Sequence, residues 1–391
     1  MADFSRVKEI PGIIADKFIS YKERRGIKGI VIPLCAIAII LVAVFFFLNR
    51  GYGSYKVLES YSSEANPSVK FASYKSKVIR YSNDGISLLS DKFQAEWTQG
   101  FNMQKPMVDI CGDYIAVADT KGDSVYLFDG SGLVKKISVT YTTEQIRVTS
   151  KGSVITVLGD QDRKYLKYYD KEGDLIAEGM VQLKKTGYPM NIDISDDGRL
   201  LVVSYLYVSN GIMKSNIVFY NFDNMGQTQL DKIVASYEYE STIIPEIRFY
   251  GNEQVVAIGD NGVYLFEGRE KPGLKKTIKF TEELESVFFD NDKFGLTFNL
   301  SGDEKPYKTE VYRSNGTRIG SFKMDTSYDT VCFSGQNILT YNDVDCKLYS
   351  MSGAVKFSYT FDNRIYLMHP VNGKDRFVLV TSDTAQVINL Q

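Results

Sequence analysis

The sequence contains very few of the side chains that most often carry out catalysis or bind a metal ion. It has one histidine, one tryptophan and four cysteines in 391 residues. A histidine-based metal site needs several donors, and a Ser-His-Asp triad would depend on His369 alone. His369 lies at the end of a predicted strand, immediately before Pro370. We therefore expect a structural histidine and no histidine-based chemistry.

Sequence motifs for bound ions and nucleotides are missing as well. Acidic turns occur at residues 160–162, 193–197 and 290–292, but none has the ligand spacing of an EF-hand loop. No glycine-rich phosphate loop follows a predicted strand and opens a helix. The charge balance is close to neutral, with a net charge of −2, which argues against a dedicated nucleic-acid binder. We expect no metal ion, no cofactor and no nucleic-acid partner.

The cysteines do not suggest a disulfide framework. Cys35 lies in a long apolar run, and Cys111, Cys332 and Cys346 lie beyond it without any short CxxC spacing. An odd number of cysteines in this second part leaves at least one unpaired. The sequence therefore predicts free thiols and a fold that is stabilised by its apolar core.

One feature present in the sequence is an uncharged apolar run, residues 29–48, which reads GIVIPLCAIAIILVAVFFFL. A helix needs about 20 apolar residues to cross a bilayer core, so this run predicts a single transmembrane helix. A cleaved signal peptide is the alternative, but the run starts late and Asn49-Arg50 follows it instead of a small-residue cleavage site. A buried helix of a soluble domain would need a helical domain around it, and none follows.

The flanking charges predict the orientation of this segment, because positive residues tend to stay in the cytoplasm. Beyond the run, only Arg50 and Lys56 lie nearby. The preceding segment is much more basic and contains Arg6, Lys8, Lys17, Lys22, Arg24, Arg25 and Lys28. We therefore expect a cytoplasmic tail (1–28), a transmembrane helix (29–48), a short connector (49–54) and an extracytoplasmic domain (55–391) of a cell-membrane protein.

The remaining part of the chain is repetitive. It is rich in strand-forming and turn-forming residues, and a unit of four short strands recurs about every 35 to 50 residues. Residues 124–132 (SVYLFDGSG) show the clearest strand and turn of this unit. Four-stranded antiparallel units at this period are typical of a β-propeller. A pair of β-sandwiches would explain the strands but not the period.

The last copy of the repeat supplies only three strands before the chain ends at Gln391. Residues 55–61 (YKVLESY) precede the first complete copy and occupy the register of a fourth strand. We expect these residues to pair with residues 385–390 and close the ring, because an unclosed blade would leave open edges. Counting the shared unit predicts eight blades, or seven if the first copy is incomplete.

The units SVYLFDGSG, LKYYDKEG, GVYLFEG and KLYSMSG resemble the strand-turn units of WD40 and quinoprotein-like repeat propellers. The Trp-Asp dipeptide of WD40 repeats is absent, and the single Trp97 does not match the recurrent tryptophans of quinoproteins. The whole layout is similar to an uncharacterised family of bacterial single-pass membrane proteins with a β-propeller ectodomain. This resemblance implies topology and fold, but no activity.

Two classes of function remain. The first is a membrane-anchored binding or scaffold propeller that recognises a protein or a cell-envelope polymer. The predicted loops at 207–216, 237–246 and 301–308 are longer than the other turns, and binding residues concentrate in such loops. We expect binding residues at Tyr207, Tyr237 and Tyr239. A sensor that signals inward is a variant of this class and would need a cytoplasmic partner.

The alternative class is an extracytoplasmic glycan hydrolase or lyase. Such enzymes use a pair of carboxylates in one pocket. Glu144, Glu246 and Glu282 lie near the starts of repeat units, where they would meet at the centre of one face. Carboxylates at such positions are more often ordinary loop charges than catalysts. The missing catalytic side chains favour the binding class.

Overall fold

The computed structural model describes residues 32–33, 35–39, 51–63, 65–160, 163–300, 302, 304–325, 327–371 and 375–391. The chain forms two compact units, Met1–Tyr52 and Gly53–Gln391. The predicted tail and most of the predicted transmembrane segment lie outside the described residues; residues 32–33 and 35–39 of that segment are helical. In the described part of the chain, no helix combines the length and the apolarity needed to cross a membrane.

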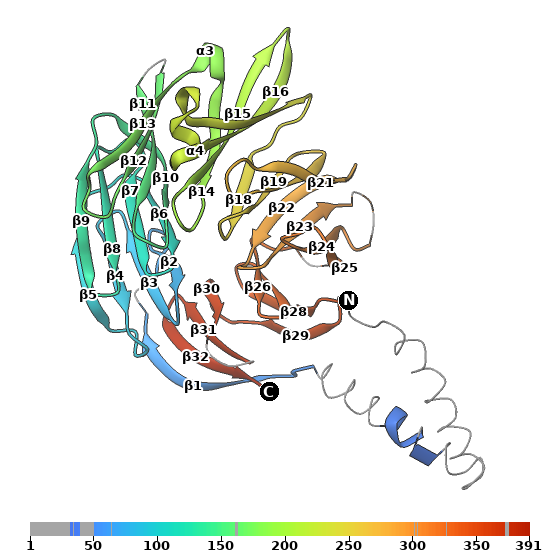
Figure 1. Ribbon diagram of the computed structural model, residues 1–391. Helices are drawn as coiled ribbons and strands as arrows, with labels where there is room; N and C mark the ends of the chain where they lie inside the picture. Colours follow the sequence, from blue (N-terminus) through green and yellow to red (C-terminus); the bar gives the residue numbers. More distant parts are fainter. Residues whose placement is uncertain are drawn as a thin grey trace, which may run out of the picture. The chain divides into compact units, whose positions relative to one another are not determined.

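The unit Gly53–Gln391 is a β-propeller of eight four-stranded antiparallel sheets (Figure 1). This confirms the prediction of an all-β propeller and the count of eight. We number the blades along the chain. Blades 1 and 2 consist of β2 (Lys70–Tyr74), β3 (Lys77–Ser82), β4 (Gly85–Leu89) and β5 (Ala95–Gly100), then β6 (Pro106–Cys111), β7 (Tyr114–Asp119), β8 (Ser124–Asp129) and β9 (Gly132–Ser138). Blades 3 and 4 consist of β10 (Thr142–Val148), β11 (Val154–Asp160), β12 (Arg163–Tyr169) and β13 (Leu175–Gln182), then β14 (Tyr188–Ile194), β15 (Leu200–Ser209), β16 (Ile212–Asn221) and β17 (Ile233–Glu240).

The second half of the ring continues the same order. Blades 5 and 6 consist of β18 (Glu246–Tyr250), β19 (Gln254–Ile258), β20 (Gly262–Glu267) and β21 (Gly273–Lys279), then β22 (Glu283–Phe289), β23 (Lys293–Asn299), β24 (Tyr307–Arg313) and β25 (Arg318–Met324). Blades 7 and 8 consist of β26 (Thr330–Ser334), β27 (Asn337–Tyr341), β28 (Asp345–Ser350) and β29 (Val355–Thr360), then β30 (Ile365–Pro370), β31 (Arg376–Thr381), β32 (Thr384–Leu390) and β1 (Tyr55–Ser62). Short helical segments are α3 (Leu183–Thr186), α4 (Asn224–Gln227) and η2 (Leu230–Lys232).

The predicted closure of the ring is confirmed. Strand β1 pairs with β32, with Tyr55 opposite Leu390 and Ser62 opposite Thr384. The backbone N–H groups of Gly53 and Ser54 both donate to the carbonyl oxygen of Gln391. The first and last described residues of the propeller are therefore hydrogen-bonded in one blade, which leaves no open edge between the two ends of the chain.

A β-bulge recurs in every blade, where the fourth strand carries one extra residue near its start. The extra residues are Glu96, Val134, Ile176, Val234, Lys275, Ile319, Lys356 and, on β1, Leu58. A bulge of this kind bends the strand and increases its twist. Strand β1 has the same bulge as the other fourth strands, so its backbone conformation is that of an outer strand.

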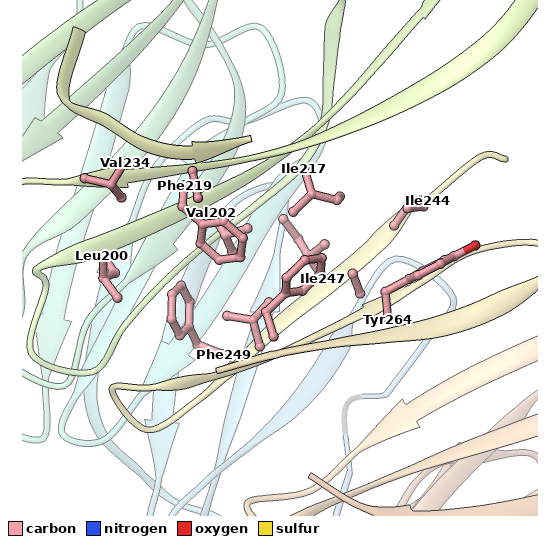
Figure 2. Close-up of a cluster of buried hydrophobic side chains, with 13 residues drawn as sticks. Leu200, Val202, Ile217, Phe219, Val234, Ile244, Ile247, Phe249 and Tyr264 are labelled. Atoms are coloured by element: carbon pink, nitrogen blue, oxygen red, sulfur yellow. The ribbon is translucent and has the colours of Figure 1, made fainter. Parts of the chain in front are cut away.

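The core lies between neighbouring blades. The middle strands are buried on both faces, and all but the last residue of β11 are buried. Figure 2 shows the interface of blades 4 and 5, where Val202 and Phe219 meet Ile247 and Phe249. Trp97 has a similar role between blades 1 and 2, because its ring stacks on Phe128 with the centroids 5.2 Å apart. Burial of this apolar surface is the main stabilising contribution of such a core.

Candidate binding site on blade 4

Blade 4 differs from the other blades in its second and third strands. β15 and β16 have ten residues each, whereas the other strands have five to eight in the described part of the chain. The two strands form a hairpin that extends away from the ring (Figure 1). Asn210 and Gly211 make its turn with φ values of 54° and 77°, the conformation that a tight hairpin needs. The tip is apolar and exposed: Val208 keeps 68%, Ile212 43% and Met213 50% of its surface.

A charged cluster lies next to the tip of this hairpin. The Nζ atom of Lys214 is 2.6 Å from a carboxylate oxygen of Glu240 and 3.0 Å from one of Glu238. Tyr207 lies opposite Lys214 in the ladder. The Tyr207 hydroxyl and the Lys214 ammonium bind the Glu238 carboxylate and lower its pKa. These side chains are held in one arrangement, as a recognition surface requires.

The other two predicted binding residues lie on β17 and pack against blade 5. Tyr237 donates a hydrogen bond to the carbonyl oxygen of Pro272 at 2.8 Å, and its ring centroid is 5.0 Å from that of Phe266. The ring of Tyr239 lies 4.2 Å from that of Tyr264. Both rings therefore contribute to the packing between blades. Their role in binding stays a prediction, as does that of Tyr207.

A groove with a volume of about 780 Å³ lies between blades 3 and 4. Its floor consists of side chains from the facing sheets, including Leu166 and Leu201. One wall is the outer strand β13, and the other is the connection between β16 and β17, residues 222–232, which includes α4 and η2. Sequence reasoning missed this groove. The available signal was the length of the β16–β17 connection, which replaces the tight turn found at this position in other blades.

The connection is held in place by specific local contacts. Asp223 caps α4 by accepting a hydrogen bond from the N–H of Asn224, and Arg199 lies 3.4 Å from the Asp223 carboxylate. Gly226 passes so close to β16 that an added Cβ atom would lie 1.6 Å from the carbonyl oxygen of Asn221. Only glycine fits there, so this residue sets the position of the wall.

Tyr220 in the floor of the groove is hydrogen-bonded to Tyr205, which does not line the groove. The hydroxyl oxygens of Tyr205 and Tyr220 are 2.7 Å apart, and Tyr205 is fully buried. Burial raises the pKa of Tyr220 to about 12, so its phenol stays protonated at neutral pH. Tyr220 lines the groove, and a hydroxyl can both donate and accept hydrogen bonds.

The three glutamates considered for catalysis are held by different partners. The Glu144 carboxylate is 2.6 Å from Nζ of Lys164 in blade 3, and the Glu282 carboxylate is 2.8 Å from Nζ of Lys308 in blade 6. Glu246 lies on β18 in blade 5 and accepts a hydrogen bond from Asn191. Burial raises the pKa of Glu246. Two of the three are therefore bound in ion pairs with a lysine of the same blade, which does not favour a shared catalytic pocket.

The inner strands carry a further set of charged residues that sequence reasoning did not single out as a site. Carboxylate oxygens of Asp109 and Asp193 each accept a hydrogen bond, at 2.7 Å, from a backbone N–H of the next blade, Val148 and Phe249 respectively. Burial raises the pKa of Asp193 to about 6. The role of these two carboxylates is to join neighbouring inner strands.

His369 lies on the inner strand β30 of blade 8, where burial lowers its pKa. Across the described ranges, no group of three or more histidine, cysteine, aspartate or glutamate residues is placed to hold a metal ion. The described cysteines are free thiols.

Comparison with solved structures shows the fold. The propeller is similar to BamB from Moraxella catarrhalis, with a TM-score of 0.53 and 9% identity over 86% of this chain and 100% of that one. It is also similar to a eukaryotic initiation factor, with a TM-score of 0.52 and 10% identity over 88% of this chain and 87% of the other. No curated protein matches the sequence. A family model matches residues 48–390, and the chain therefore belongs to the family described as a family of unknown function, DUF5711.

Proposed function

We propose that this chain is a single-pass membrane protein whose propeller lies outside the cytoplasm and binds a protein or a cell-envelope polymer. The carrying observation is the β15–β16 hairpin, which is longer than the other hairpins of the described chain and has the exposed apolar tip Val208, Ile212 and Met213. Exposed apolar side chains grouped on a protruding element are typical of interaction sites. The uncharged run at residues 29–48 and the basic segment before it support the membrane anchor.

The position of the hairpin within the propeller supports the proposal. Strand β1 is a fourth strand, so it begins at the end of a blade where the turns between third and fourth strands lie. Turns between second and third strands lie at the opposite end. Gly53 and the β15–β16 turn are therefore on opposite faces of the propeller. The connector 49–54 spans at most about 20 Å, so an anchor before it would leave the hairpin face free for a partner.

The experiment is chemical crosslinking of the full-length protein in its native membrane, followed by purification. We expect that replacing both Val208 and Met213 with aspartate reduces the crosslinked partner by about tenfold or more, because charges at the centre of an apolar contact are costly to bury. Thermal unfolding should stay unchanged, since both side chains are largely exposed.

The matched control is Val355→Asp on β29, an exposed apolar residue of another blade with 50% of its surface accessible. It should retain the partner. Equal loss in this control, or full retention in the hairpin variant, would refute the proposed face. Tyr207→Ala should act in the same direction as the hairpin variant. Variants of Tyr237 and Tyr239 need a parallel stability measurement, because both rings pack between blades.

A further inference from the structure

We propose that the groove between blades 3 and 4 accepts an extended polypeptide segment of a partner protein as a fifth strand on the free edge of β13. The inference rests on the proposed binding function and names the kind of segment that this propeller would recognise. Addition of a strand to a sheet edge provides main-chain hydrogen bonds, and flanking pockets select the side chains.

The backbone edge of β13 faces the groove. The residues that line it include the consecutive run 177–182. Side chains alternate between the two faces of a strand, so contact with one face would involve every second residue only. A run of six consecutive residues therefore indicates an edge-on approach. β13 pairs with β12 on one side and with none of the described strands on the other, so every second residue directs its N–H and C=O toward the groove.

The opposite wall offers apolar contacts to such a segment. Ile233 lines the groove and keeps 37% of its surface exposed. The backbone before Ile233 is held in an unusual conformation, because the two preceding residues, Asp231 and Lys232, have φ values of 54° and 60°. Left-handed backbone at two successive non-glycine residues costs free energy and persists where the surrounding structure imposes it.

Carboxylates lie on both walls of the groove. Glu178 on β13 is 3.5 Å from Nζ of Lys167, and Asp231 lies on the opposite wall beside Lys232. The Asp231 carboxylate is near enough to contribute to the raised pKa of Tyr220 on the floor. We therefore expect a segment with apolar side chains at alternate positions and a lysine or arginine between them. Its charge complements the Asp231 carboxylate.

A second cavity in the described part of the chain has a volume of about 220 Å³ and lies between blades 8 and 1. It takes Glu59 alone from the outer strand β1, so it contacts no continuous edge. The β16–β17 connection is what turns the edge of β13 into one wall of a groove.

The test uses the full-length protein in detergent and a phage-displayed library of random nine-residue peptides. Selection on the wild-type protein is followed by removal of phage that also bind the Ile233→Asp variant. We expect enriched peptides that alternate apolar residues and contain a basic residue. A synthetic copy of an enriched peptide should slow amide hydrogen exchange in residues 177–182, because a paired edge is protected. Methylation of every second backbone nitrogen of that peptide should weaken binding by about tenfold or more, since it removes main-chain donors.

Leu274→Asp on β21 is the matched control, because Leu274 is an exposed residue of another outer strand, with 44% of its surface accessible. It should bind the peptide as the wild type does. The proposal is overturned if no peptide is enriched, if the methylated peptide binds equally well, or if residues 177–182 show no added protection. It is also overturned if the protein dimerises and Ile233→Asp dissolves the dimer, since a second copy would then occupy the edge. The two proposals can fail separately. If the Val208 and Met213 variant loses the native partner but the selection enriches no peptide, the proposed function is retained and only this inference is rejected.

Discussion

At the residue scale, Phe93 is an exception to the repeat. The turn between the third and fourth strands of blades 3, 6 and 7 places Gly173, Gly316 and Gly353 at positive φ. In blade 1 the same position is Phe93, with a φ of 55° and the same backbone hydrogen bond to the residue three positions earlier. The Phe93 ring lies 5.7 Å from that of Tyr61 on β1. The aromatic contact with the closing strand offsets the backbone strain.

Two substitutions at Phe93 separate these effects. Phe93→Ala keeps the left-handed backbone and loses the contact, so we expect a decrease of about 1–3 kcal/mol in the free energy of unfolding. Phe93→Gly also loses the contact but relieves about 1–2 kcal/mol of strain, so it should be less destabilising than the alanine variant. Denaturant titration of the three proteins measures both differences. A glycine variant that is less stable than the alanine variant would contradict this account.

Asp193 should make stability depend on pH. Burial raises its pKa from the usual value near 4 to about 6, against the opposing effects of Arg147 and the N–H of Phe249. The folded protein then binds this proton more tightly than the unfolded chain does. Its contribution to the free energy of unfolding is therefore greatest below pH 4, falls as the pH rises to about 6, and is lost above that. The total change is about 3 kcal/mol.

Asp193→Asn keeps an oxygen that can accept the hydrogen bond from Phe249 and removes the titration. Between pH 4 and pH 7, we expect the free energy of unfolding to change by about 3 kcal/mol less in this variant than in the wild type. Urea titrations of both proteins at several pH values provide the comparison. The contributions of the other titrating groups are the same in both proteins and therefore cancel in the difference. Parallel pH profiles for the two proteins would show that Asp193 does not carry the effect.

At the scale of elements, the closing strand is the one whose removal changes the architecture. β1 supplies the fourth strand of blade 8, and its bulge at Leu58 matches the bulges of the other seven blades. Without β1, the ladder edge of β32 would be unpaired. An unpaired strand edge invites pairing with another chain.

We therefore expect a shortened chain that starts at Asn66 to unfold at lower temperature, or to aggregate more, than one that starts at Tyr52. The physical reason is the loss of one ladder and of the contacts between Tyr61 and Phe93. Differential scanning calorimetry and light scattering of the two shortened chains give the comparison. Equal behaviour would show that the closure contributes little to stability.

At the scale of the whole molecule, the proposed topology can be tested directly. Because the basic residues precede residues 29–48, we expect the N-terminus in the cytoplasm and Gln391 outside. Protease added to intact cells, or to protoplasts where a wall limits access, should degrade the propeller and spare an epitope tag at the N-terminus. Lysed cells provide the control, in which both parts are digested. A propeller that is protected in intact cells would reject the topology.

The fold could be predicted from the sequence because its determinants are local and repeated. Each blade is encoded by strands and turns that lie within about 35 to 50 residues of one another, and the missing fourth strand of the last copy pointed to residues 55–61. The structure confirms both the eight blades and the pairing of β1 with β32. The membrane segment remains a prediction from composition and flanking charge.

The candidate site depended on contacts between blades, which no local pattern encodes. Tyr237 and Tyr239 have the alternation of an exposed strand, yet blade 5 covers their rings. Glu144 and Glu282 are surface charges in the sequence, but each meets a lysine on its own blade across the ladder or the blade edge. The groove requires β13 and residues 222–232, which come from different blades.

The sequence by itself determined the strands, the turns and the closure, because those follow from backbone hydrogen bonding and alternation along short segments. Only the tertiary structure decided which side chains are free for binding, because exposure depends on what the neighbouring blade covers.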